Sequence, residues 1–403
     1  MTRSVKVIVS VVGLVVVVGV AVALVVVWPL IHEDKDDLDV TGGSTPGSVK
    51  SAQEMTDLPL PMQLARTKAA RIEYVSTDRA GKPTTVSGSV FTPGGDAPPG
   101  GWPVVAVGHG TSGIDNDCAP SRSKDLLGLI GLAQGLVGAK YAVTIADYQG
   151  LGMPGVHPYL DAATAGRNII DSVRAVRALY GNVSTDWGGY GSSQGGGAIW
   201  AANEESATYA PELRLVGTVD AAPAADVVGL VDKARSGTLT VDQGPAVQAI
   251  IESAARTHSD IVRDDYRSGS VRANWDVLGA CSGPLVARRD AAIKQIGRFE
   301  LAPRDDAAAK RLTDLLESYA VPKRAAAAPM LVVFGDADTF IDPAWTRKAV
   351  LEACALGDTV EVSEQPGKGH SDIDISNALD WLVDRFDGGS APSDCANLSR
   401  VAR

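Results

Sequence analysis

The segment Gly191-Ser192-Ser193-Gln194-Gly195 has the spacing G-x-S-x-G, in which a serine occupies a sharp turn between a strand and a helix. Only Ser193 has a glycine two positions away on both sides. Such a turn needs glycine because it strains the backbone and brings neighbouring backbone too close for a Cβ. A helix that begins after Ser193 would point free N–H groups at a developing oxyanion. The pattern therefore predicts that Ser193 is a nucleophile.

A nucleophilic serine needs a base, and the chain has five histidines that could supply one. His32 lies beside an apolar N-terminal run, His258 lies in a helical region, and His157 precedes the serine. His109 lies in a loop that is expected to supply an oxyanion donor. His370 follows the last predicted strand, where the base is found when the chain order is serine, acid, histidine. We therefore predict that His370 is the general base.

The acid that orients this histidine is expected after the preceding strand, where the segment 334–343 carries three aspartates. Asp342 precedes Pro343, which is typical of an N-cap followed by proline in the first helical turn. Asp336 follows the strand directly, and Asp338 lies within the loop at the usual position of the acid. We predict Asp338, with Asp336 as the alternative, to hold the imidazole tautomer and stabilise the imidazolium.

Two backbone N–H groups are expected to bind the oxyanion. One belongs to Gln194, which follows the nucleophile, and the other to the loop over 109–111, which follows a buried strand. We predict Thr111 as the second donor and Gly110 as its alternative. This chemistry needs neither a metal nor a cofactor, and we expect neither.

The segment Gly150–Gly155 matches G-x-G-x-x-G after a strand, the pattern of a dinucleotide-binding turn. Pro154 interrupts the helix that should follow. The acidic residue about twenty positions further on, Asp171, falls within a predicted helix and not at the end of a second strand. We therefore interpret this segment as a structural turn.

Strand-like apolar runs alternate with amphipathic helical patterns along most of the chain. A hairpin is expected over 71–91, and buried strands are expected over 103–108, 141–146, 213–219, 330–334 and 359–362. Helices are expected over 126–137, 168–180 and 375–386. This alternation predicts an α/β protein with a mostly parallel sheet and helices on both faces. Strands are nearly lacking from 225 to 323, where helical patterns over 247–255, 285–299 and 307–319 predict a helical insertion.

The expected organisation has five parts. They are an N-terminal membrane anchor or signal segment (1–32), a flexible linker (33–58), the first part of the core (59–224), a helical cap (225–325) and the second part of the core (326–403). The linker is expected because Gly, Ser and Thr are frequent between Thr41 and Ser51. The tail after Asp387 is predicted to be loop.

Five motifs resemble the secretory lipase family, which includes the fungal lipase A type. They are Gly108–Gly113, Cys118–Ser121, Ala146–Gly152, His157–Leu160 and Gly189–Gly196. The resemblance extends from about Leu60 to the C-terminus. It implies an α/β-hydrolase core with a helical cap, and extracellular hydrolysis of lipid esters. The apolar N-terminal segment departs from the family pattern.

The chain has four cysteines and no C-x-x-C pair, which disfavours zinc and fits two disulfides in an exported protein. The sequence alone allows three pairings. The family resemblance implies Cys118–Cys281 and Cys354–Cys395.

The N-terminal run Val7–Trp28 has no charged residue, and its length is close to the ~20 residues that span a bilayer. Arg3 and Lys6 precede it, so the bulk of the chain is expected outside the cell. We predict a membrane anchor, or secretion if the segment is a cleaved signal peptide. The net charge of -11 argues against a nucleic-acid partner.

These observations predict an exported serine ester hydrolase, a triacylglycerol lipase or carboxylesterase, that acts on lipid or other esters through an acyl-enzyme. The alternatives are a peptidase or acyltransferase on the same fold, or an inactive surface-binding protein. The helical cap is expected to cover Ser193 and to offer apolar side chains to an acyl chain. The candidates are Val247, Ile250, Ile251, Trp275 and Leu278. The alternative, expected for most of them, is that they form only the internal core of the cap.

Overall fold

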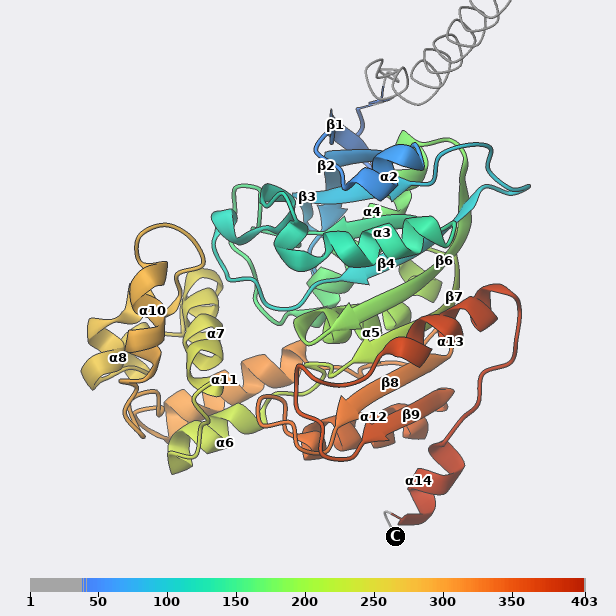
Figure 1. Ribbon diagram of the computed structural model, residues 1–403. Coiled ribbons are helices and arrows are strands. Elements are labelled where there is room, and N and C mark those ends of the chain that lie inside the picture. The colour runs from blue at the N-terminus through green and yellow to red at the C-terminus, as the bar shows by residue number, and fades with distance from the viewer. Residues whose placement is uncertain (1–37, 39, 41, 402–403) are drawn as a thin grey trace, which may run out of the picture.

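The computed structural model describes residues 38, 40 and 42–401 (Figure 1). The N-terminal segment 1–32, for which we predicted an anchor or signal, lies outside the described residues. Among the residues that are described, no helix is long and apolar enough to cross a membrane.

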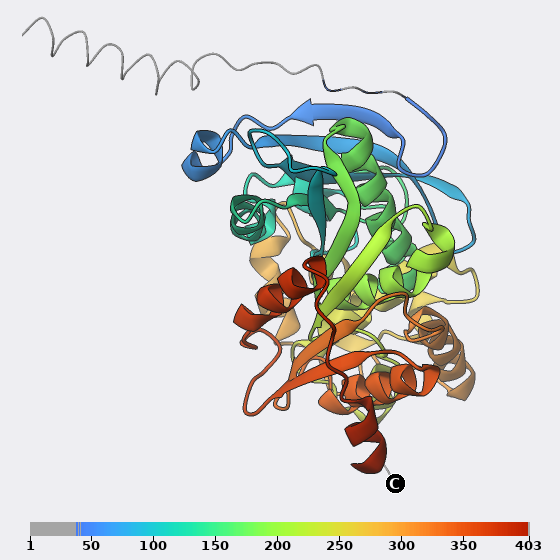
Figure 2. The same ribbon diagram turned by 90° about the vertical axis from the view of Figure 1, so that its right-hand side faces the viewer.

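The described chain forms one nine-stranded sheet in the order β1-β2-β3-β5-β4-β6-β7-β8-β9. The strands are β1 Val49–Glu54, β2 Lys68–Thr77, β3 Pro83–Thr92, β4 Trp102–Gly108, β5 Ala142–Ala146, β6 Val183–Ser192, β7 Arg214–Ala221, β8 Met330–Gly335 and β9 Val360–Gln365. β1, β2, β3 and β5 pair antiparallel, and the strands from β5 to β9 pair parallel. The sheet is strongly twisted from β1 to β9 (Figure 2). The predicted hairpin and mostly parallel sheet are confirmed.

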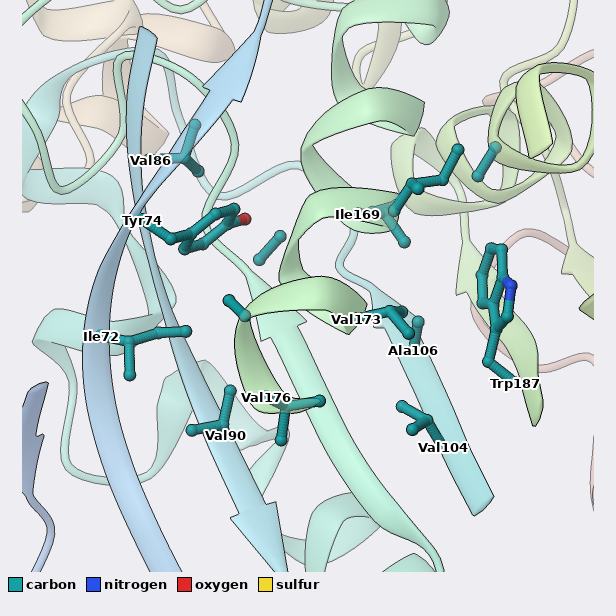
Figure 3. Close-up of a cluster of buried hydrophobic side chains, with 14 of the residues drawn as sticks. Ile72, Tyr74, Val86, Val90, Val104, Ala106, Ile169, Val173, Val176 and Trp187 are labelled. Carbon is teal, nitrogen blue, oxygen red and sulfur yellow. The ribbon is translucent and has the colours of Figure 1, made fainter. Parts of the chain in front are cut away.

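Helices cover both faces of this sheet because side chains alternate along its strands. Val104 and Ala106 of β4 face α4, whereas Val105 and Val107 face α3. The main helices of the core are α3 Ile130–Gly138, α4 Ala162–Leu179, α5 Gln194–Tyr209, α12 Pro343–Leu356 and α13 Ser376–Phe386. Figure 3 shows Ile169, Val173 and Val176 of α4 among the side chains of the neighbouring strands. These three residues are buried, as the helical periodicity predicted.

Between β7 and β8 the chain leaves the sheet and forms the helical insertion (residues 222–329). Its helices are α6 Gly229–Ser236, α7 Gln243–Thr257, α8 Gly269–Ala273, α9 Trp275–Leu278, α10 Val286–Ile293 and α11 Asp306–Tyr319. They lie together beside the sheet (Figure 1). The sequence predicted α7 and α11, overextended α10 to 285–299, and did not resolve α6, α8 and α9.

Two sequence predictions at the ends of the described chain were wrong. The linker predicted over 33–58 contains β1, which pairs with β2. Most side chains of β1 are exposed or half-buried, so this edge strand lacks the apolar alternation that marks a strand. The tail predicted as loop contains α14 Cys395–Val401. Just before it, the Asp394 N–H donates to Val360 O and the Asp394 carboxylate accepts from the Val362 N–H, so the tail covers the edge of β9.

Candidate functional site

Ser193 lies between β6 and α5 in a strained conformation, with φ 57° and ψ −119°. Its N–H donates to Ala221 O of the neighbouring strand. A Cβ added at Gly191 would collide with Gly195 O, and one added at Gly195 would collide with Gly108 O. Glycine at both positions therefore allows the turn to pack against β4, and the turn presents the serine at the carboxyl end of the sheet.

The structure brings Ser193, His370 and Asp338 into one hydrogen-bonded chain. Ser193 Oγ lies 2.9 Å from His370 Nε2, and His370 Nδ1 lies 2.7 Å from Asp338 Oδ2. A carboxylate only accepts, so Nδ1 carries the proton and Nε2 is free to accept from the serine hydroxyl. The ring of Phe340 meets the imidazole edge to face, with the ring centroids 4.9 Å apart.

Asp338 is held by its own loop. The carboxylate is buried, and its Oδ1 accepts hydrogen bonds from the N–H groups of Phe340 (2.8 Å) and Ile341 (2.9 Å). These bonds fix the carboxylate and leave Oδ2 for the histidine. The alternative acid, Asp336, is exposed and accepts from the Gly367 N–H at 2.6 Å. Asp342 caps α12 by accepting from the Ala344 N–H at 3.0 Å, as predicted.

The two predicted oxyanion donors, Thr111 and Gln194, line a small cavity together with Ser193. Gln194 is the first residue of α5, so its N–H has no partner within the helix. A Cβ added at the alternative donor, Gly110, would lie 3.8 Å from Ser193 Cβ. The loop after β4 therefore lies beside the serine, where a second donor is needed.

The structure gives the other three described histidines, His109, His157 and His258, partners other than Ser193. His109 is buried, and its ring stacks on Tyr148 with centroids 4.2 Å apart. His157 is 1% exposed, and burial lowers its pKa to about 3. This imidazole is therefore neutral at physiological pH. His258 lies 2.8 Å from Thr257 Oγ1 at the end of α7.

The segment Gly150–Gly155 packs against its own chain. A Cβ added at Gly150 would collide with the backbone N of His157, and one added at Gly152 would collide with Ser87 Oγ. Both glycines have positive φ, at 79° and 73°. The close packing and turn conformation support the interpretation of this segment as a structural turn. No group of three metal-ligating side chains occurs in the part of the chain that the structure describes.

Two adjoining cavities lie between the loops that carry Thr111 and Phe340 and the helical insertion. The one beside Ser193 has about 10 Å³, and the wider one has about 270 Å³. Four residues line both, namely Thr111, Tyr159, Ala246 and Phe340. Tyr159 and Ala246 were not singled out as site residues because their positions depend on tertiary packing.

For most of the acyl-binding candidates the alternative is confirmed, namely that they form the internal core of the cap. Val247, Ile250, Ile251 and Trp275 are buried in the core of the helical insertion, and neither cavity is lined by them. Leu278 does line the wider cavity. Helical periodicity marks a residue as buried, but it does not say which partner buries it.

Both disulfides have the pairing that the family resemblance implied. Cys118–Cys281 has a Cα–Cα distance of 5.6 Å, and Cys354–Cys395 has one of 5.3 Å. The first joins the segment that follows residues 109–111, named the oxyanion loop for its predicted role, to the helical insertion. The second joins α12 to the C-terminal tail.

Comparison with known proteins matches a sequence model of the secretory lipase family to residues 129–394. Lipase A of Arthroderma benhamiae is 26% identical over 266 residues, which cover 63% of this chain and 55% of the relative. Lipase 5 of Candida albicans is 26% identical over 326 residues, which cover 71% and 65%. The chain thus spans less than two thirds of the length of these two relatives.

Solved lipase and esterase structures share the fold. Candida antarctica lipase A in its closed state has a TM-score of 0.69 and 17% identity, and the match covers 91% of this chain and 88% of that one. The rice cell wall degrading esterase LipA from Xanthomonas oryzae has a TM-score of 0.69 and 19% identity, with 86% and 100% covered. The fold is that of an α/β-hydrolase. Because the family model spans more than half of the sequence, the chain belongs to the secretory lipase family.

Proposed function

We propose that the protein is an exported serine hydrolase of carboxylic esters that acts through an acyl-enzyme. The observation that carries the proposal is the hydrogen-bonded chain from Ser193 Oγ through His370 to Asp338. Membership of the secretory lipase family supports ester hydrolysis. The two disulfides support export, because such bonds persist in oxidising surroundings.

His370 Nε2 takes the proton of Ser193 as Oγ attacks the ester carbonyl carbon. The N–H groups of Gln194 and Thr111 donate to the oxyanion of the tetrahedral intermediate. The imidazolium then gives its proton to the departing alcohol oxygen, which leaves the acyl group on Ser193. A water molecule, deprotonated by the same imidazole, attacks the acyl-enzyme; the imidazolium then returns the proton to Ser193 Oγ as the bond to the acyl group breaks and the acid leaves. Asp338 stabilises the imidazolium in both halves of the cycle.

We propose that the helical insertion acts as the cap of this site and contributes to substrate selection. The small cavity beside Ser193 has apolar walls that include Leu160, Leu230 and Ile341. Its volume of about 10 Å³ is close to the space of one water molecule. In this closed arrangement a short acyl group fits better than a long one, so esters of short acids are the expected substrates.

The lining of the wider cavity favours an ester substrate whose alcohol portion is polar. Its lining includes Arg289, Asp242 and Gln248, and the Arg289 Nε–H donates to Leu278 O at 2.9 Å, which orients the guanidinium. Such a wall solvates a hydroxylated alcohol better than a hydrocarbon. Nitrophenyl esters of increasing acyl length, compared with glycerol esters and emulsified triglycerides, test both statements.

The Ser193→Ala variant tests the nucleophile. We expect kcat for a nitrophenyl ester to fall by a factor on the order of 10⁵–10⁶, while the thermal midpoint of unfolding stays within a few degrees of wild type. The neighbouring Ser192→Ala variant is the matched control and should retain activity. A fluorophosphonate probe should label the wild type and the control only. Labelling of the Ser193→Ala variant would show that another residue is the nucleophile.

A further inference from the structure

The segment 157–159 contacts both predicted oxyanion residues with its side chains. His157 Nε2 lies 2.9 Å from Gln194 Nε2, and the Tyr159 hydroxyl lies 2.7 Å from Thr111 Oγ1. His157 and Tyr159 are 1% and 3% exposed. These two bonds connect one short buried segment with two residues that are 83 positions apart in sequence.

The tautomer of His157 fixes the orientation of the Gln194 amide. His157 Nδ1 lies 2.9 Å from Gln149 O, and a carbonyl can only accept, so Nδ1 carries the proton. Burial lowers the pKa of His157 to about 3, so the ring is neutral and Nε2 has a free lone pair. The Gln194 amide nitrogen therefore donates to Nε2. The flipped amide would set its oxygen against this lone pair.

Tyr159 holds the loop that carries Thr111 through its hydroxyl group. Burial raises the pKa of this phenol to about 12, so it stays protonated and able to donate. Thr111 is exposed, and its side chain is held by the hydrogen bond with the Tyr159 hydroxyl. The bond to Tyr159 therefore connects the exposed end of the oxyanion loop to a buried anchor.

The helical insertion holds the segment from its other side. Ser253 of α7 is 2% exposed, and its hydroxyl donates to His157 O at 2.6 Å. Ser253 Oγ also accepts a hydrogen bond from the Tyr159 N–H, at 2.9 Å. One serine of the insertion thus bonds the backbone on both sides of Pro158. The collision of any Gly150 Cβ with the His157 backbone shows how closely the preceding turn supports the segment.

We propose that His157 and Tyr159 are positioning residues for the oxyanion hole, and that Ser253 couples their position to the helical insertion. Oxyanion donors contribute to the rate only when they point at the position where charge develops. Restraining the side chains of Gln194 and Thr111 restrains the backbone N–H groups of the same residues. This inference rests on the proposed function, because it assigns both N–H groups to the oxyanion.

The Tyr159→Phe and His157→Leu variants each remove one of these bonds. We expect kcat for a short nitrophenyl ester to fall about 10- to 100-fold, with KM within twofold of wild type. Affinity for a trifluoromethyl ketone, which forms an oxyanion on the serine, should fall by a similar factor. The His157→Gln variant restores an acceptor at the place of Nε2 and should recover most of kcat.

The Tyr74→Phe variant is the matched control for a purely structural effect. Tyr74 is buried, lines neither cavity and bonds neither oxyanion residue; its hydroxyl donates to Asn168 O of α4 at 2.8 Å. This variant should lose comparable thermal stability and keep its kcat. The Ser253→Ala variant should lower kcat by a few fold, and its effect should be less than additive with that of Tyr159→Phe.

Two outcomes separate this inference from the proposed function. If the wild type hydrolyses esters but Tyr159→Phe and His157→Leu change kcat no more than Tyr74→Phe does, the positioning role is wrong and the function stands. If the wild type hydrolyses no ester and binds no trifluoromethyl ketone, the proposed function itself is wrong.

Discussion

The turn between β6 and α5 that carries Ser193, here called the elbow, and the helical insertion are held in place by different forces. At the elbow, backbone packs on backbone, and an added Cβ at Gly191 or Gly195 has no room. In the insertion, a cluster of charged side chains adds to an apolar core. Glu252 accepts from the Nε–H groups of Arg256 (2.8 Å) and Arg263 (2.5 Å) and from the indole N–H of Trp275 (2.7 Å).

This difference predicts where each region is sensitive. Packing of backbone on backbone does not depend on pH, but it excludes even one added carbon. Charged contacts depend on protonation and on salt, and they tolerate changes in shape. The same contacts also hold the insertion to the core, since Arg256 reaches Asp115 beside the oxyanion loop at 2.7 Å. The elbow should therefore govern the chemical step, and the insertion should govern stability at low pH and substrate selection.

Among the variants that test this comparison, the largest effect is expected at Asp338, the carboxylate that bonds His370 beside the elbow. Asp338→Asn preserves the size of the side chain but removes the charge that holds the His370 tautomer, so kcat should fall by a factor on the order of 10⁴. Asp336→Asn, with its contact to Gly367 N–H, should change kcat less than threefold, within the range of exposed substitutions. Steady-state hydrolysis of a nitrophenyl ester measures both. A larger loss for Asp336→Asn would move the acid to that residue.

The second effect concerns the space at the elbow. Gly195→Ala places a carbon against Gly108 O, and the backbone cannot move aside, so the free energy of unfolding should fall by at least about 3 kcal/mol. Gly135→Ala in α3 is the matched control. That position is exposed, has nothing near its Cβ, and should gain about 0.5–1 kcal/mol of stability as a helical alanine. Urea unfolding measures both, and equal losses would contradict the packing argument.

The core was largely predictable because its signals are local. The alternation of strands, the helix face of Ile169, Val173 and Val176, and the order of nucleophile, acid and base can be found without knowing any contact. The choice of Asp338 over Asp336 rested on position alone, and the structure places the Asp338 carboxylate beside His370.

The helical insertion was predicted less well because its helices are short and are defined by their contacts. The helical periodicity predicted that Val247, Ile250 and Ile251 are buried. Only the three-dimensional packing shows that they face the core of the insertion and not a substrate. The strand β1 and the helix α14 escaped detection for a related reason. Both are stabilised by a neighbour, β2 in one case and the Cys354–Cys395 bond in the other.

The third prediction concerns the charged contacts of Glu252 in the insertion. Burial alone would raise the pKa of Glu252, but the bonds from Arg263, Trp275 and Arg256 outweigh it and hold this pKa at about 2. The folded value lies below the unfolded one, near 4.5, so the stabilisation is complete above about pH 4.5 and is lost as the pH falls toward 2. Glu252→Gln should therefore cost about 1.5–3 kcal/mol at pH 7.

At pH 3 the difference in stability between this variant and the wild type should be clearly smaller, because protonation removes part of the same interaction from the wild type. Chemical unfolding of both proteins at pH 7 and pH 3 measures the two differences. If the variant is equally destabilised at both pH values, the charge of Glu252 does not stabilise the insertion.

The smallest effect is expected where the insertion meets the elbow. Ala246 of α7 is half-buried and lines both cavities, so Ala246→Leu adds three carbons to the space in which the substrate lies. Each CH₂ of the acyl chain that loses its buried place costs about 0.8 kcal/mol, or roughly fourfold in kcat/KM. Acetate esters should be hydrolysed almost as before, whereas butyrate and hexanoate esters should lose progressively more of their kcat/KM.

Ala255→Leu on the same helix is the matched control, because Ala255 packs on the core of the insertion and lines neither cavity. If Ala246→Leu changes kcat/KM for all chain lengths by one factor, the helical insertion does not select the acyl group, and its contribution is limited to covering the site.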